Sequence, residues 1–190
     1  NAVDAALAAS ATLCVVEPHM TGIGGDCFAI VAEPDGTIHG LNGSGRAPRA
    51  AESDRYRALG YHAVPEFGPL SITVPGAIKA WEVLRDRFGT LAFDRLFADA
   101  IRYAEDGFAV HQRVASDWQR VASRLQADEG GRRHFLVDGE APAHGSRFRA
   151  PAMGRTLRAI AQGGAKAFYE GTIAAEMAAT VQALGGFLAE

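Results

Sequence analysis

Residues 17–48 read EPHMTGIGGDCFAIVAEPDGTIHGLNGSGRAP and carry the clearest structural pattern in the chain. Pro34-Asp35-Gly36 has the residue types of a tight turn. Two strands are predicted on either side of this turn, over residues 26–32 and 37–42. Glycines lie before the first strand and after the second, where a backbone must approach a neighbour closely or take positive φ. A hairpin between two glycine loops is typical of the rim of a binding site.

The first strand and the rest of the chain give the fold class. Cys27–Ala32 is continuously apolar, so we expect both faces of that strand to be covered. Residues 2–15 predict a helix that ends before Pro18. Residues 127–150 predict an exposed loop with one short strand near 134–137. Further apolar stripes at helical spacing predict a mostly helical remainder, with stripes that begin at Ala77, Phe93, Val114, Leu157 and Ile173. The expected class is α+β, with residues 1–190 forming a single domain.

Composition excludes several classes of protein. The 190 residues are 48% hydrophobic and carry a net charge of −3, which gives no electrostatic case for nucleic acid or an anionic membrane as a partner. No apolar run approaches the roughly 18 residues of a membrane span. We therefore expect a soluble protein, cytoplasmic or periplasmic, with Cys14 and Cys27 as free thiols.

The loop Gly22–Gly25 has two interpretations. A phosphate-binding loop follows a strand and opens a helix, whereas this loop follows a helix and opens a strand, which argues against a nucleotide site. It is either a tight helix-to-strand turn or a backbone wall that lines a substrate cleft, with Gly24 and Gly25 beside the strand.

His19 lies near two carboxylates, those of Glu17 and Asp26. This grouping admits a metal or acid–base role, but no second histidine stands at ligand spacing. We favour structural hydrogen bonding for His19 and expect no metal and no cofactor.

Several segments resemble the γ-glutamyltranspeptidase family of N-terminal-nucleophile hydrolases. Asn1–Ala6, Val16–His19 and Gly22–Gly25 resemble its large subunit, and Thr73–Ala77 and Ala165–Gly171 are similar to later segments in the family's order. The resemblance implies a layered α-β-β-α sandwich of which this chain is the large-subunit part. It also implies a γ-glutamyl amide such as glutathione as substrate, cleaved or transferred after self-cleavage of a precursor. The implied partner is the protein's own small subunit, and a homo-oligomer is possible.

The resemblance also points to a carboxylate-binding position. In the family an arginine four residues before the proline of the Ala-Pro pair grips the substrate's α-carboxylate, and Ser44 stands at that position here. Arg46 lies two residues later, on the same face of an extended chain, and has the planar fork that carboxylates prefer. Arg46 is therefore either a carboxylate ligand or a structural, surface arginine. The predicted substrate-binding residues are Arg46, Ser44, Asn42, Gly24 and Gly25.

No catalytic residue is predicted in this chain. The family's nucleophile is a threonine exposed as a new N-terminus, and Asn1 has neither hydroxyl nor thiol, so we expect the nucleophile beyond residue 190. Three hypotheses remain open: part of a γ-glutamyltransferase or hydrolase, part of an acylase for another amide such as a glutaryl amide, or a non-catalytic fragment.

Overall fold

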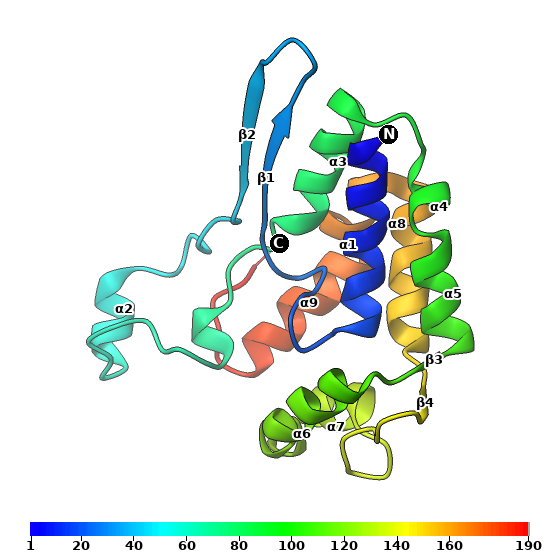
Figure 1. Cartoon of the computed structure of the whole chain (residues 1–190). Coiled ribbons are helices and arrows are strands. Elements are labelled where there is room, and N and C mark those ends of the chain that lie inside the picture. The colour runs from blue at the N-terminus through cyan, green and yellow to red at the C-terminus, as the bar shows by residue number, and fades with distance from the viewer. Residues whose placement is uncertain (190) are drawn as a thin grey trace. The chain divides into compact units, whose positions relative to one another are not determined.

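The computed structural model describes residues 1–189, and their contacts define two compact units (Figure 1). Unit 1 comprises Asn1–Gly22 and Arg87–Gln162; unit 2 comprises Ile23–Asp86 and the described residues from Gly163 onward. Both units are mainly helical with short antiparallel strand pairs, so the α+β class is confirmed. The single domain stays a prediction. Across residues 1–189, no helix has both the length and the hydrophobicity that crossing a membrane requires.

Unit 1 packs helices around an aromatic and aliphatic core. Helix α1 contacts α4 and α5, and α6 lies beside α7 (Figure 1). Trp118 is 1% exposed and meets Phe148 edge-to-face, with ring centroids 4.8 Å apart. The elements that lie wholly in this unit are α1 (Ala2–Val16), α4 (Phe93–Leu96), α5 (Ala98–Asp106), β3 (Phe108–Ala109), α6 (Gln112–Ala127), α7 (Glu129–Phe135) and β4 (Arg147–Phe148).

The helix α7 lies in the segment 127–150, for which the sequence predicted an exposed loop. The loop prediction is therefore wrong in part. Asp128 caps α7 by accepting a 2.6 Å hydrogen bond from the Gly131 amide. Gly131 also lets α7 approach α6, because a Cβ there would lie 2.5 Å from the Leu125 carbonyl oxygen. Gly131 thus serves close packing rather than a loop. The short strand expected near residues 134–137 is also wrong, since α7 ends at Phe135 and Val137 takes part only in an isolated bridge with Glu140.

A buried carboxylate joins two distant segments of unit 1. Asp4 is 3% exposed, and its oxygens accept hydrogen bonds from the Thr90 amide at 3.0 Å, the Thr90 hydroxyl at 2.6 Å and the Leu91 amide at 3.2 Å. The Thr90 hydroxyl is the largest of the causes that hold the pKa of Asp4 far below its usual value. Asp4 therefore fixes the segment that leads into α4 against the start of α1.

We expect Asp4→Asn to lower the Tm of the full-length protein by roughly 5 °C or more at pH 7, because buried donors lose a charged acceptor. A carboxyl whose pKa falls on folding stabilises the fold above its unfolded pKa, near 3.9, and loses this contribution as the pH falls through the folded pKa. The gap in Tm between wild type and Asp4→Asn should therefore shrink in melts at pH 3. Asp99→Asn, at a carboxylate 73% exposed in the same unit, is the control. An equal gap at both pH values would contradict the assignment.

Unit 2 contains a hairpin and several helical segments. Strands β1 and β2 pair antiparallel, with Cys27 opposite Gly43 and Ala32 opposite Ile38. Helix α3 packs its apolar stripe inward, and Ile78 and Trp81 are buried. The elements are β1 (Cys27–Ala32), β2 (Ile38–Gly43), α2 (Ser53–Ala58), η1 (Pro69–Ser71), α9 (Thr172–Ala183), most of α3 (Ala77–Phe88) and the end of α8 (Pro151–Tyr169).

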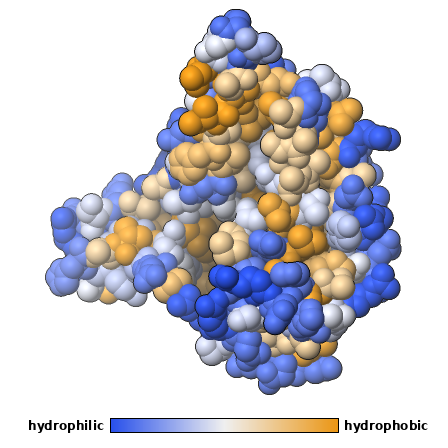
Figure 2. Space-filling model, in the orientation of Figure 1, coloured by the Kyte–Doolittle hydropathy of each residue, from blue (hydrophilic) through white to orange (hydrophobic). Residues whose placement is uncertain are grey.

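The hairpin contradicts the expectation that β1 is covered on both faces. Phe28 is 65% exposed, Ile30 is 82% exposed, and Ile38 on the same face is 70% exposed. Only the alternate residues of β1 are partly covered. The apolar run is present, but β1 and β2 form a two-stranded sheet with no element of the described chain over this face. Figure 2 shows the resulting hydrophobic surface on the hairpin.

Candidate functional site

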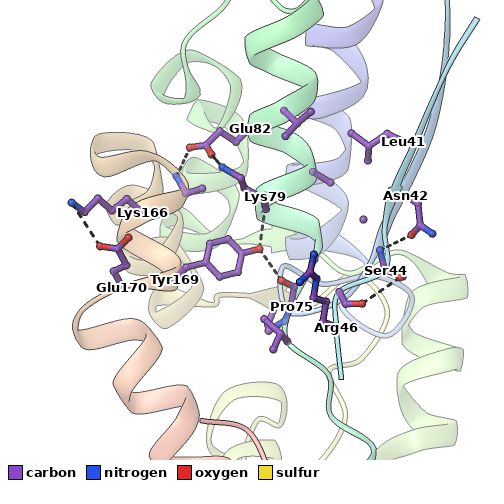
Figure 3. Close-up of a pocket in the computed structure, with 17 residues that line it drawn as sticks. Leu41, Asn42, Ser44, Arg46, Pro75, Lys79, Glu82, Lys166, Tyr169 and Glu170 are labelled. Carbon is purple, nitrogen blue, oxygen red and sulfur yellow. Dashed lines mark hydrogen bonds and ion pairs between the residues drawn. The ribbon is translucent and has the colours of Figure 1, made fainter. Parts of the chain in front are cut away.

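A cavity of about 860 Å³ in unit 2 brings together three segments that are far apart in the sequence (Figure 3). The end of β2 and the following loop form one wall, over residues 41–46. Residues 74–76 and the first turns of α3 form the second, and the last turn of α8 forms the third. Asn42, Ser44 and Arg46 all line this cavity, so the structure brings these three predicted residues together.

Local hydrogen bonds shape the loop that follows β2. The Asn42 side chain accepts a 3.0 Å hydrogen bond from the Ser44 amide, which is an Asx turn. Gly45 follows with φ of +77°, a conformation in which side chains are strained. The chain then places Arg46 at the cavity with an exposed side chain that takes part in no ion pair within residues 1–189.

The loop is locked to residues 74–76 by backbone contact. The Val74 amide donates a 2.9 Å hydrogen bond to the Arg46 carbonyl oxygen. A Cβ at Gly76 would lie 2.0 Å from the Gly43 carbonyl oxygen, so only glycine permits this approach. The position of the Arg46 backbone is therefore set by a segment almost thirty residues away in the sequence.

The start of α3 is capped by groups from outside the helix. The amides of Gly76 and Ala77 both donate to the Gly25 carbonyl oxygen at 3.0 Å. The Lys79 amide donates to the Tyr169 phenol oxygen, also at 3.0 Å. These bonds satisfy backbone N–H groups that have no partner within the helix at its N-terminus.

The cavity also carries paired charges on α3 and α8. The Lys79 ammonium lies 2.5 Å from Glu82, and this hydrogen bond raises the pKa of Lys79. Glu82 also accepts a 3.1 Å hydrogen bond from the Ala165 amide, directly after Gly164, where φ of +68° interrupts α8. Lys166 and Glu170 form a looser pair at 3.7 Å.

The two predicted glycines lie elsewhere. Gly24 is exposed, with open space where a Cβ would stand, and neither Gly24 nor Gly25 lines the cavity. Gly25 instead contributes the carbonyl oxygen that caps α3. Their role in substrate binding stays a prediction.

Sequence reasoning missed the part of the cavity that α3 and α8 form. Lys79, Glu82, Lys166, Tyr169 and Glu170 line it. These residues lie outside the apolar stripes of their helices. In the sequence they therefore resemble ordinary surface positions. One signal was available: Tyr169 and its neighbours belong to the segment Ala165–Gly171 that the sequence analysis had singled out.

His19 lies beside a buried carboxylate, and its structural hydrogen bonding stays a prediction. Its Nε2 lies 3.3 Å from Asp117 of α6, and the side chain is 8% exposed. Arg113 donates to Asp117, at 2.7 Å. Burial lowers the pKa of His19. Residues 1–189 contain no cluster of three or more metal-ligating side chains.

Comparisons with known proteins agree on one family. The family model described as gamma-glutamyltranspeptidase matches residues 1–190. Oxamate amidohydrolase proenzyme of Klebsiella pneumoniae is 40% identical over 97% of this chain and 36% of its own length. The glutathione hydrolase-like YwrD proenzyme of Bacillus subtilis is 34% identical over 99% of this chain and 36% of its own. This chain thus spans about a third of the length of these relatives.

Solved structures give the same result for the fold. The γ-glutamyltranspeptidase of Helicobacter pylori matches with a TM-score of 0.93 and 29% identity, over 99% of this chain and 55% of that chain. Cephalosporin acylase from Bacillus halodurans matches with a TM-score of 0.92 and 38% identity, over 99% of this chain and 36% of that chain. The fold expected from the sequence, that of N-terminal-nucleophile hydrolases, is confirmed.

Proposed function

Because the chain belongs to the γ-glutamyltranspeptidase family, we propose that the whole protein hydrolyses or transfers the acyl group of an amide that carries a carboxylate. A γ-glutamyl amide of the glutathione type is the first candidate substrate. The observation that carries the proposal is the Arg46 guanidinium, which lines the cavity of unit 2 and has no ion-pair partner among residues 1–189.

The charge pattern of the cavity singles out Arg46. The other two cations, Lys79 and Lys166, each lie within 4 Å of a carboxylate of the chain. Arg46 is the cation that is left to receive a carboxylate from outside. Its planar fork can donate two parallel hydrogen bonds, which fixes the orientation of the ligand as well as its position.

Orientation of the substrate is what this part of the protein contributes to the reaction. An amide is cleaved when a nucleophilic oxygen attacks its carbonyl carbon and the amine departs with a proton. Holding the acyl carboxylate fixes the distance between that carbon and the nucleophile. In this proposal the nucleophile and the small subunit belong to the part of the family's length that this chain does not match.

The exposed face of the hairpin fits such a partner. Phe28, Ile30 and Ile38 form a hydrophobic strip on a two-stranded sheet (Figure 2). A sheet face of this kind is stable when another layer covers it. We assign the covering layer to the remainder of the protein rather than to a second copy of it.

A second candidate substrate class is an amide whose acyl group carries a carboxylate but lacks the α-ammonium of γ-glutamyl, such as a glutaryl amide. Ser44 favours it, because a serine at the family's arginine position offers one hydroxyl in place of a guanidinium fork. The named activity of one similar protein, an oxamate amidohydrolase, supports the same class, because oxamate carries a carboxylate and no α-ammonium. Arg46 would bind the carboxylate in both cases.

The test compares three anilides with the full-length protein: γ-glutamyl, glutaryl and the uncharged butyryl. We expect kcat/KM for at least one of the two carboxylate substrates to exceed that for the butyryl anilide by about tenfold or more, which corresponds to 1.4 kcal/mol. A preference for the γ-glutamyl over the glutaryl anilide selects the first candidate, and the reverse selects the second. Equal rates for all three would contradict a carboxylate site.

A further inference from the structure

We propose that Tyr169 is a positioning residue that holds the carboxylate-binding Arg46 in place, although it lies on α8, far from Arg46 in the sequence. The inference rests on the proposed function, since it assigns Tyr169 a part in substrate binding through Arg46. It concerns a residue to which the sequence pattern had given no role.

Two hydrogen bonds link Tyr169 to Arg46 through residues 74 and 75, and a third holds the phenol. The Tyr169 hydroxyl donates to the Pro75 carbonyl oxygen at 2.8 Å, across 94 residues of sequence. The neighbouring Val74 amide donates to the Arg46 carbonyl oxygen at 2.9 Å. The third bond runs from the Lys79 amide to the Tyr169 oxygen at 3.0 Å and holds the phenol itself. Figure 3 shows the phenol between Lys79 and Pro75, with Arg46 beyond Pro75.

The phenol is suited to this task in both geometry and protonation. Tyr169 is partly covered, and its ring meets that of Phe168 edge-to-face with centroids 5.1 Å apart. Burial raises the pKa of Tyr169, which keeps the hydroxyl protonated and able to donate to Pro75. A neutral phenol has one proton to donate and lone pairs to accept, and both are used here.

The loop that carries Arg46 rests mainly on residues 74–76. Residues 44–52 form no helix or strand. Besides the Val74 bond and the close approach of Gly43 and Gly45 to residues 74–76, the loop around Arg46 is shaped by the short-range turn from Asn42 to Ser44. If the Pro75 carbonyl loses its donor, residues 74–76 gain freedom, and the Arg46 backbone follows them through the Val74 bond.

The kinetic test uses Tyr169→Phe, which keeps the ring and removes the hydroxyl. In the full-length protein, with the preferred carboxylate anilide, we expect KM to rise about tenfold, equivalent to 1.4 kcal/mol, while kcat stays within about twofold. The butyryl anilide should show no change. Tyr61→Phe is the matched control, because the Tyr61 hydroxyl has no hydrogen-bond partner among residues 1–189.

A double-mutant cycle separates positioning from an independent effect. If Tyr169 acts through Arg46, Tyr169→Phe should add no further loss in an Arg46→Ala background. A full additional loss there would overturn the inference and leave the proposed function intact. If Arg46→Ala itself leaves the preference for carboxylate unchanged, both the proposed function and the role of Tyr169 fail.

Amide hydrogen exchange gives a readout that does not depend on turnover. Tyr169→Phe should speed exchange at Val74 and Lys79, with no change at the hairpin amides of β1. Unchanged exchange at Val74 would overturn the inference.

Should Tyr169→Phe fail to fold, difluorotyrosine at position 169 replaces it, since its phenol ionises near neutral pH. KM for the carboxylate substrate should then rise as that phenol loses its proton, and a flat profile would count against the positioning role.

Discussion

Arg46→Ala in the full-length protein is expected to lower kcat/KM for the preferred carboxylate substrate by about tenfold to a hundredfold. The loss of a charge-assisted hydrogen bond costs roughly 1.5–3 kcal/mol, which corresponds to this range. The effect should appear for the γ-glutamyl or glutaryl anilide and be absent for the butyryl anilide. Steady-state kinetics on the three substrates measure it.

Arg46→Lys should recover little of the lost activity, because an ammonium is a point charge and cannot supply two parallel hydrogen bonds. Arg49→Ala is a useful control, since Arg49 is also exposed in the same loop and lines a neighbouring pocket with Arg46, but does not line the 860 Å³ cavity. If Arg46→Ala leaves kcat/KM within about twofold of wild type, Arg46 is a structural residue and the carboxylate site lies elsewhere.

Gly76→Ala is expected to lower the Tm of the full-length protein by roughly 10 °C or more and to abolish the preference for carboxylate substrates. A Cβ at this position would lie 2.0 Å from the Gly43 carbonyl oxygen and 2.6 Å from the Gly45 nitrogen. Both are backbone atoms, so no side-chain rotation relieves the clash. The loop must separate from residues 74–76, and Arg46 moves with it.

Gly40→Ala is the matched control for this prediction. Gly40 lies in β2 of the same unit, and no atom stands within 4 Å of the position that its Cβ would occupy. Its effect on Tm should be within about 2 °C, as for most surface substitutions. If Gly76→Ala and Gly40→Ala melt at the same temperature, the two segments do not make the close approach described above.

The order of the elements and the family were available from the sequence. Apolar residues at helical spacing predicted α1, α3, α6 and α9, because a helix that buries one face requires that period. The turn residues Pro34-Asp35-Gly36 predicted the hairpin for an equally local reason. The segment from Asn42 to Arg46 was a candidate site through the family resemblance, which pointed to the position of Ser44 and so to Arg46 two residues later.

Several features of the fold and of the cavity depend on tertiary packing and could not be predicted from local sequence patterns. An apolar run does not show how many layers cover a strand, so the exposure of Phe28 and Ile30 was not predictable. The helix α7 depends on packing against Leu125 as much as on its cap. The second and third walls of the cavity come from residues 74–83 and 165–170. The second wall is bonded to the loop through the Val74 amide and the Arg46 carbonyl oxygen, and the third reaches the second through the Tyr169 hydroxyl. Tyr169 shows the reason plainly: its partner Pro75 lies 94 residues away, and nothing in the residues around either one encodes that pairing.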